Sequence, residues 1–325
     1  MTNSSENIKK PWLTPEQQVA HLASKGVRFS LMSEREAVNY LVVNNNYFRL
    51  RSYGSSFQKV CSGARQGEYA NLDFKMLVDL SIIDMLLRNE MLPLTLDIEH
   101  FAKVRLLGKI EQAGEDGYAV VHDFLASYDC VTLSGKVLNR TKEEVARGKS
   151  SPYVAGILRK YPEFDFPVWA FLELIAFGTF IYFYKFCAER FEDKAMLDDF
   201  YILQNVKCLR NACAHNNCIL NDMSSGIPMY KPRAAVSSAI GQIDSIGRSL
   251  RRSKLSNDRL QQVATTLFMH QRFASSGVCE NRGQSLQVFV DRMFKHIDYY
   301  CGNEQICSAF EFIAKLIAAW FGDEK

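Results

Sequence analysis

The chain has 325 residues, of which 47% are hydrophobic and 23% are charged, and its formal net charge is +3. This composition is typical of a globular protein with a large core, and it excludes a disordered chain or a strongly polybasic one. Nine cysteines, an odd number, do not indicate a disulfide framework in a chain of this length. No apolar N-terminal stretch indicates a signal peptide, so we expect a cytoplasmic protein with reduced thiols.

The first segments predict two short helices after ten polar residues that we expect to be disordered. Thr14 and Ser33 each begin a capping box, in which a Gln or Glu follows three positions later and caps the same helix end. An aromatic and basic run follows at residues 46–54. Its two cations, Arg49 and Arg51, are candidates for binding nucleic acid.

A long helical pattern covers about residues 72–112, and Pro93 should kink or split it. Asp84 and Arg88 stand four residues apart in this pattern, which predicts an ion pair on the helix surface or between helices. Residues 131–152 are polar and have no apolar period. We therefore expect a mobile insertion or a solvated loop there.

The segment 166–186 is almost continuously apolar and is about as long as a membrane span. Glu173 in its interior and Pro167 near its start argue against a membrane helix. We expect instead one central helix of a helical bundle, with all of its faces buried. A carboxylate in such surroundings needs a partner, for which Arg210 is the candidate and an ordinary interhelical ion pair is the alternative.

Helical patterns resume at about residues 234–250, 257–275, 284–300 and 304–321. Between residues 231 and 275, eight basic side chains stand against two acidic ones. This excess indicates either an acidic partner such as nucleic acid or a solvated basic face, and the candidates are Arg251, Arg252 and Lys254. Strand-like alternation is scarce, so the fold class should be all-α, divided into regions 1–65, 66–230 and 231–325.

The clearest chemical pattern lies in a predicted helix where Arg210, Asn211 and His215 read Arg-Asn-x-x-x-His. Asn211 and His215 are four residues apart and share one helical face, and the long side chain of Arg210 can reach the same cleft. Arginine binds phosphate through bidentate hydrogen bonds from two N–H groups of its guanidinium, and histidine transfers protons near neutral pH. The three residues therefore suit a phosphodiester, although a single helical histidine is more often an ordinary structural residue.

A zinc site is the competing interpretation of this segment, because Cys208, Cys213 and Cys218 accompany His215. These positions fan out around a helix and include no Cys-x-x-Cys knuckle, which argues against zinc. Cys213 and His215 diverge as well, so a thiol nucleophile is not expected. Since phosphate-loop and dinucleotide motifs are also missing from the sequence, we expect no metal and no cofactor.

The Arg-Asn-x-x-x-His pattern resembles the signature of the HEPN ribonucleases, and the run from Leu209 to Asn216 is similar to the abortive-infection (Abi) branch of that superfamily. Other elements extend this resemblance over about residues 8–222. In the Asn-Tyr-Phe-Arg-Leu element at residues 46–50, Phe48 stands where the family usually has a second Tyr. That change removes a hydroxyl and is expected to leave the packing unaffected. The other matching residues are Lys10, Pro11, Gln18, Gly26, Tyr53, Trp169, Glu173, Phe177, Gly178 and Thr179.

The resemblance implies a HEPN-like helical bundle with N- and C-terminal helical extensions. It also implies a metal-independent endoribonuclease that acts as an RNA toxin in antiphage defence. Such a protein forms a homodimer and does not bind a membrane. An RNA or protein antitoxin or regulator would control its activity. A catalytically silent module that binds RNA or protein is the alternative. The residues implied are Arg210, Asn211 and His215 as catalytic groups, with Glu173, Glu99 and Asn216 as supporting candidates.

Overall fold

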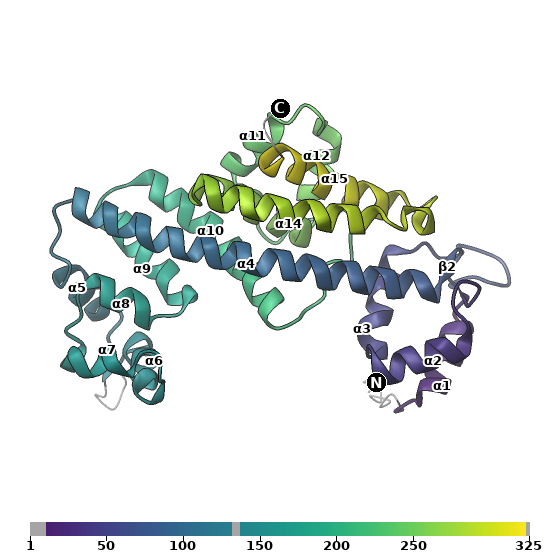
Figure 1. The fold of residues 1–325 in the computed structure, drawn as a ribbon, viewed down its shortest axis with the longest axis horizontal. Coiled ribbons are helices and arrows are strands. Elements are labelled where there is room, and N and C mark those ends of the chain that lie inside the picture. The colour runs from purple at the N-terminus through teal and green to yellow at the C-terminus, as the bar shows by residue number, and fades with distance from the viewer. Residues whose placement is uncertain (1–10, 132–136, 323–325) are drawn as a thin grey trace, which may run out of the picture.

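The long helix α4 (Phe74–Gln112) is the element around which the other helices are arranged (Figure 1). The computed structural model describes residues 11–131 and 137–322, so residues 1–10, predicted to be disordered, and Lys10 of the resemblance lie outside it. The 39 residues of α4 span about 60 Å. Helices dominate the described residues, and the only sheets among them are two-stranded, which confirms the predicted all-α class.

The N-terminal group of short elements lies at one end of α4 (Figure 1). Both predicted capping boxes are present, at Thr14 and at Ser33. Val27 pairs with Leu72 in a short parallel sheet, which ties the beginning of the chain to the start of α4. The elements are α1 (Pro15–Ala23), β1 (Val27–Arg28), α2 (Glu34–Val43), α3 (Tyr47–Ser52), η1 (Tyr53–Ser56) and β2 (Leu72–Asp73).

Pro93 lies inside α4, which continues through it, so of the predicted kink or split the split is wrong. A proline in a helix interior removes one backbone hydrogen bond and costs about 3 kcal/mol. Met91 and Leu94 beside it are fully buried, and so is Thr95, which donates to the carbonyl of Leu92 at 2.7 Å. The packing of both flanking turns against other helices therefore outweighs the local cost.

The region expected to be a loop, residues 131–152, is largely structured where it is described. Asn139 caps a short helix whose inward side chain, Val145, is 1% exposed. Its polar composition reflects the outer face of an amphipathic helix; residues 132–136 lie outside the described part of the chain. The elements are α5 (Ala119–Ser127), β3 (Cys130–Val131), β4 (Val137–Leu138), α6 (Arg140–Arg147), η2 (Gly148–Ser150), α7 (Ala155–Lys160) and η3 (Pro162–Phe164).

The apolar segment 166–186 forms two helices, α8 (Val168–Leu174) and α9 (Phe177–Arg190), so the prediction of one central helix is wrong. Ile175 and Ala176 adopt extended backbone conformations and interrupt the helix between α8 and α9. Within the described residues, no helix has both the length and the apolarity that a membrane span requires.

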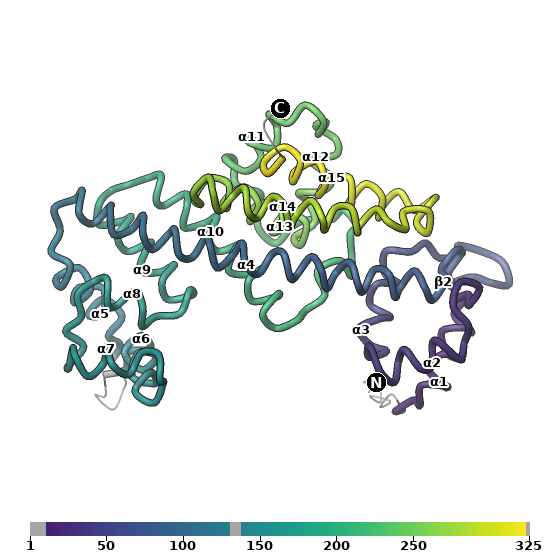
Figure 2. Tube along the Cα trace, viewed as in Figure 1, coloured from purple at the N-terminus to yellow at the C-terminus, as the bar shows by residue number. Residues whose placement is uncertain are grey.

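Of the C-terminal helices, α13 and α14 pack along the middle of α4 (Figure 2). The predicted helix 234–250 is two helices, and the predicted helix 284–300 starts eight residues earlier and ends at Phe294. The elements are α10 (Lys194–Ala214), α11 (Ala234–Gly241), α12 (Arg248–Leu255), α13 (Asp258–Phe273), α14 (Ser276–Phe294), η4 (Ile297–Tyr300) and α15 (Glu304–Phe321).

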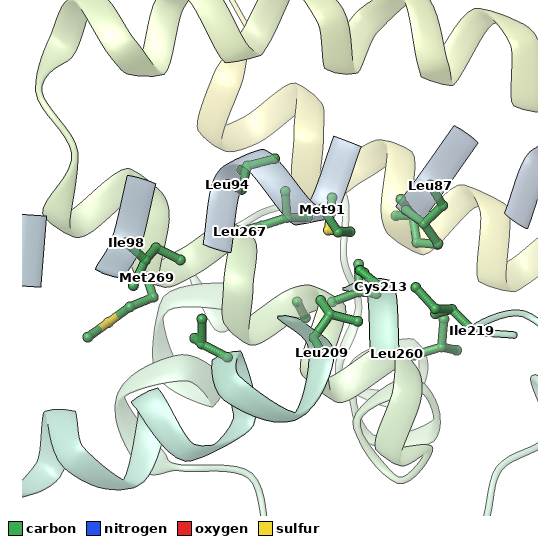
Figure 3. Close-up of a cluster of buried hydrophobic side chains, with 14 of the residues drawn as sticks. Leu87, Met91, Leu94, Ile98, Leu209, Cys213, Ile219, Leu260, Leu267 and Met269 are labelled. Atoms are coloured by element: carbon green, nitrogen blue, oxygen red, sulfur yellow. The ribbon is translucent and has the colours of Figure 1, made fainter. Parts of the chain in front are cut away.

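One continuous hydrophobic core joins these groups, from Val19 near the beginning of the chain to Ile317 near its end. Its centre lies where α4, α10 and α13 meet (Figure 3). Leu87 and Met91 of α4 face Leu209 of α10 and Leu260 of α13 there. The C-terminal region thus shares the core of the middle region, and the division into three regions remains a prediction.

Candidate functional site

Helix α10 presents the Arg-Asn-x-x-x-His residues at its C-terminal end because its inner face is apolar. Leu209 and Cys213 point into the core with 1% and 7% exposure (Figure 3). The polar positions next to them in sequence consequently point outward. Asn211 is exposed, and Arg210 is half-buried.

Arg210 and Asn211 contact each other directly. The Nη1 of Arg210 donates to the Oδ1 of Asn211 at 3.3 Å, so the guanidinium does swing toward Asn211. The Nε of Arg210 is buried and has no hydrogen-bond partner among the described residues. This N–H donor is therefore unused within the described chain.

His215 is the first residue beyond α10. Its backbone N–H donates to the carbonyl of Asn211 at 2.9 Å, so the two residues keep the predicted helical relationship. The imidazole is exposed, and it makes no hydrogen bond with any described residue. An imidazole in this position is accessible to a ligand in solvent.

The chain turns sharply after His215 at Asn216, which has a φ of 58°. Arg49 of α3 donates to the backbone carbonyl of Asn216 and, at 3.3 Å, to its side-chain oxygen. Asparagine is among the few residues that adopt this left-handed conformation readily. Two candidates that lie 167 positions apart, Arg49 and Asn216, thus meet at the end of α10.

Asp84 of α4 fixes the segment that follows this turn. Its carboxylate is fully buried and accepts hydrogen bonds from the backbone N–H groups of Ile219 and Leu220 at 2.7 and 2.8 Å. Tyr53 donates to it at 2.7 Å, and Arg88 forms an ion pair with it. We call this arrangement the Asp84 clamp.

The clamp corrects and extends the prediction for Asp84 and Arg88. They do form an i,i+4 pair, but it is buried, and Arg88 also donates to the carbonyl of Asn217 at 3.2 Å. Burial and the charge of Asp84 raise the pKa of Tyr53, so its hydroxyl keeps the proton that it donates. The sequence signal was available, because Asp84 interrupts the apolar stripe of α4 next to Ile83.

A hollow of about 530 Å³ lies between α3, the end of α10 and the start of α13. None of the three motif residues lines it, although their neighbours Leu209, Ala212 and Asn216 do. Its side chains are cationic, amide, hydroxyl or apolar, and none is acidic. The lining residues are Asn46, Phe48, Arg49, Ser52, Leu209, Ala212, Asn216, Asn217, Cys218, Ile219, Asn221, Arg259 and Gln262.

The two carboxylates predicted to support the motif lie elsewhere. Glu173 is exposed on α8 and forms no ion pair within the described residues, so the expected pair with Arg210 is wrong. The reason is that α8 buries Phe171 and Leu172 and leaves Glu173 on its outer side. Glu99 pairs with Lys103 on the same helix at 3.1 Å.

The basic candidates of the C-terminal region do not share one surface. Lys254 is 4% exposed and donates to Ser308 of α15 at 2.6 Å, and burial lowers the pKa of its ammonium group. Its placement therefore contradicts a role on the surface. Arg251 covers Gly241, while Arg252 lines a second hollow of about 680 Å³. In the N-terminal group, Arg51 is exposed on α3.

The side chain of Phe48 is 82% exposed and does not pack in the core. It lies at the same hollow as Arg49. Sequence reasoning missed both this ring and Arg259 as site residues. The aromatic and basic composition of residues 46–54 was the available signal for Phe48, whereas Arg259 could not be placed without the fold.

The cysteines around the motif diverge. Cys208 is exposed and Cys213 is buried, and burial raises the pKa of the Cys213 thiol to about 12. A thiolate nucleophile is therefore not available at Cys213 near neutral pH. Over residues 11–131 and 137–322, no group of three or more His, Cys, Asp or Glu side chains is placed to hold a metal ion.

Together these features define an all-α protein with a half-buried arginine, an exposed asparagine and an exposed histidine at one helix end, next to a segment held by a buried carboxylate. Residues 40–221 match the family described as Abi-like protein, and the chain belongs to that family. No curated protein and no solved structure matches the chain. The match includes Arg49, the Asp84 clamp and the motif, and it ends before Arg259 and the C-terminal helices.

Proposed function

We propose that this protein is a metal-independent endoribonuclease of the HEPN type that acts in abortive infection. One observation carries the proposal: the last turn of α10 and the residue after it carry a guanidinium bonded to an amide and an exposed imidazole. Membership in the Abi-like protein family supports the biological role. A cytoplasmic RNA toxin of this kind needs control by an RNA or protein antitoxin or another regulator.

In the proposed reaction, the 2′-hydroxyl of a ribose attacks the adjacent phosphorus. His215 accepts the proton of that hydroxyl, and the bond from phosphorus to the 5′-oxygen breaks. Arg210 neutralises the charge that develops on the phosphate oxygens, and Asn211 orients the guanidinium through the hydrogen bond described above. The products are a 2′,3′-cyclic phosphate and a 5′-hydroxyl.

The leaving 5′-oxygen needs a proton from a second acid. No other histidine forms part of this described site, so we propose a homodimer in which the α10 ends of two chains face each other. The second His215 then serves as the general acid. In a twofold-symmetric dimer, one sequence provides both the general base and the general acid, one from each chain.

A catalytically silent module of the same fold is the second candidate. It is favoured by the fact that the motif residues do not line the 530 Å³ hollow beside them. Such a module would bind RNA or protein through the hollow without cutting. The two functions differ in whether RNA is cleaved, so one assay separates them.

The test is cleavage of a labelled RNA strand by purified protein. We expect His215→Ala to lower the rate by about 10²–10⁴-fold, and Arg210→Ala by about 10²–10³-fold. The matched controls are His122→Ala, whose side chain is 84% exposed, and Arg35→Ala, which is also exposed. Both controls should keep the wild-type rate.

The same assay tests the chemistry. Cleavage should continue in EDTA, should leave 5′-hydroxyl ends, and should stop when the 2′-oxygen at the cut site is methylated. Restoration of an EDTA-inhibited activity by magnesium would contradict the proposal, as would 5′-phosphate products. If wild type and the two motif variants all leave RNA intact, the silent module is the better description.

A further inference from the structure

The hollow between α3, the end of α10 and α13 carries the groups that one nucleotide requires. We propose that it binds an unpaired nucleotide of a nucleic-acid strand, with the base against Phe48 and a phosphate between Arg49 and Arg259. The inference rests on the proposed function for its choice of RNA as the principal strand. Its volume of about 530 Å³ lies within the range of small-molecule sites.

Phe48 supplies a stacking surface. Its ring is 82% exposed on α3, whereas Leu50 of the same helix is fully buried. A single exposed aromatic residue is ordinary on a protein surface. Phe48 differs because it borders a hollow that contains two arginines, which is the combination found in proteins that bind single strands.

The charge of the hollow favours an anion. Arg49 and Arg259 line it, and no lining residue is acidic. Arg49 uses one guanidinium nitrogen to hold Asn216, while the side chain of Arg259 has no acceptor within the described residues. Two guanidinium groups without acidic partners suit a phosphate, which accepts several charge-assisted hydrogen bonds.

The remaining polar groups can contact the edge of a base. Asn217, Asn221 and Gln262 each offer an amide with both donors and an acceptor. The Oδ1 of Asn221 is buried and has no partner among the described residues. A buried acceptor without a donor is unfavourable, and the exocyclic amine of a base would satisfy it.

The hollow is assembled from two parts of the chain that differ in their relation to the family. Phe48, Arg49 and Asn217 lie within the residues matched to the Abi-like protein family, whereas Arg259 and Gln262 of α13 lie beyond them. One wall of the site is therefore contributed by the C-terminal helices. This assignment gives α13 a ligand-binding role in addition to its role in the core.

The test uses an oligonucleotide that cannot be cleaved and reports stacking. A short 2′-O-methyl RNA strand with one 2-aminopurine is titrated with protein, and fluorescence quenching reports stacking of that base. Phe48→Ala should weaken binding about tenfold and remove most of the quenching. Phe48→Tyr should preserve both, and Tyr153→Ala, an aromatic that is 91% exposed elsewhere, is the matched control.

Arg259→Gln tests the phosphate contact. It should weaken binding and lower the slope of log affinity against log salt by about 0.7, the value for one phosphate contact on a single strand. Arg35→Gln is its control, because that arginine is exposed on α2. A DNA strand of the same sequence is a second arm, in which Phe48→Ala should also weaken binding; the tighter strand identifies the natural source.

Unchanged affinity in Phe48→Ala and Arg259→Gln would overturn the proposal. Weakening by Arg259→Gln alone would also overturn it, since the hollow would then bind an anion without a base. Equal binding of a fully paired duplex would exclude an unpaired nucleotide. Because the strand cannot be cut, these outcomes are independent of catalysis: loss of cleavage with intact binding contradicts only the proposed function.

Discussion

At the scale of single residues, Asp84 is a carboxylate that is fully buried in the core. Its side chain is fully buried, and it accepts hydrogen bonds from Tyr53, Ile219 and Leu220 in addition to its ion pair with Arg88. A buried carboxylate is tolerated only when its oxygens are satisfied in this way. The clamp therefore links η1, α4 and the segment that follows α10 through one charge.

The Asp84→Asn variant should be strongly destabilised. The amide has a similar shape but no charge, and it leaves Arg88 buried without its counter-ion. Removing one partner of a buried ion pair lowers the free energy of unfolding by about 3–5 kcal/mol. Urea unfolding of the variant and of wild type measures this difference in the free energy of unfolding. Asp244→Asn, at an exposed aspartate, should change it by less than about 0.5 kcal/mol.

Residue-scale predictions from the sequence succeeded where local geometry decides and failed where tertiary packing decides. The four-residue spacing of Asn211 and His215 correctly predicted their helical relationship. The predicted pairing of Glu173 with Arg210 was wrong. The orientation of α8 depends on the interruption of the helix at Ile175, which no local sequence pattern identified. Arg259 reaches the hollow from a helix whose position is set by the whole core.

At the scale of elements, α6 and α9 illustrate how one helix can cap another. The N-cap residue of α9, Ala176, makes no side-chain hydrogen bond to the first backbone N–H groups of that helix. Glu144 of α6 does so instead, accepting from the backbone N–H of Ala176 at 2.7 Å and from the hydroxyl of Thr179 at 2.6 Å. The segment predicted to be a loop thus stabilises α9, a helix further along the chain.

Glu144→Ala should lower the free energy of unfolding by about 1–2 kcal/mol, because α9 loses its cap. The adjacent Glu143→Ala is a matched control, since Glu143 is exposed on the same helix. Thermal and urea unfolding of both variants give the comparison. Equal stability of the two variants would show that the Glu144 contacts contribute little.

Helices with a complete local signal were predicted well, and those bounded by tertiary contacts were not. The capping boxes at Thr14 and Ser33 correctly predicted where α1 and α2 start. A split, one of the two alternatives predicted at Pro93, was wrong, and so was the uninterrupted helix through Ile175, for the opposite reason. Core packing preserves α4 across a proline, and it favours a break at an apolar position between α8 and α9.

At the scale of the whole molecule, a single core extends from the N-terminal group to the last helix. The motif end of α10 remains on the surface of this body, with the imidazole of His215 directed to solvent. One chain therefore presents one histidine and one arginine at the proposed site. The proposed reaction requires two proton-transfer steps, which is the basis for expecting two chains.

Light scattering of an RNA-cleaving sample should give about twice the chain mass of 37.1 kDa. A homodimer is expected because only a second copy adds another imidazole to the proposed site. The Asp244→Asn protein, altered at an exposed residue, should give the same mass. A mass of one chain in a sample that still cleaves would rule out the composite site.

The Asp84 clamp has a consequence for synthesis of the chain. Asp84 binds residues 135 and 136 positions later, and the ribosome needs roughly 7–27 s to make that length at 5–20 residues per second. Throughout that interval the acceptor on α4 has no backbone partner. A product that ends before Leu220 contains Arg210, Asn211 and His215 but lacks the residue that completes the Asp84 clamp, so the clamp cannot be completed until residue 220 has emerged.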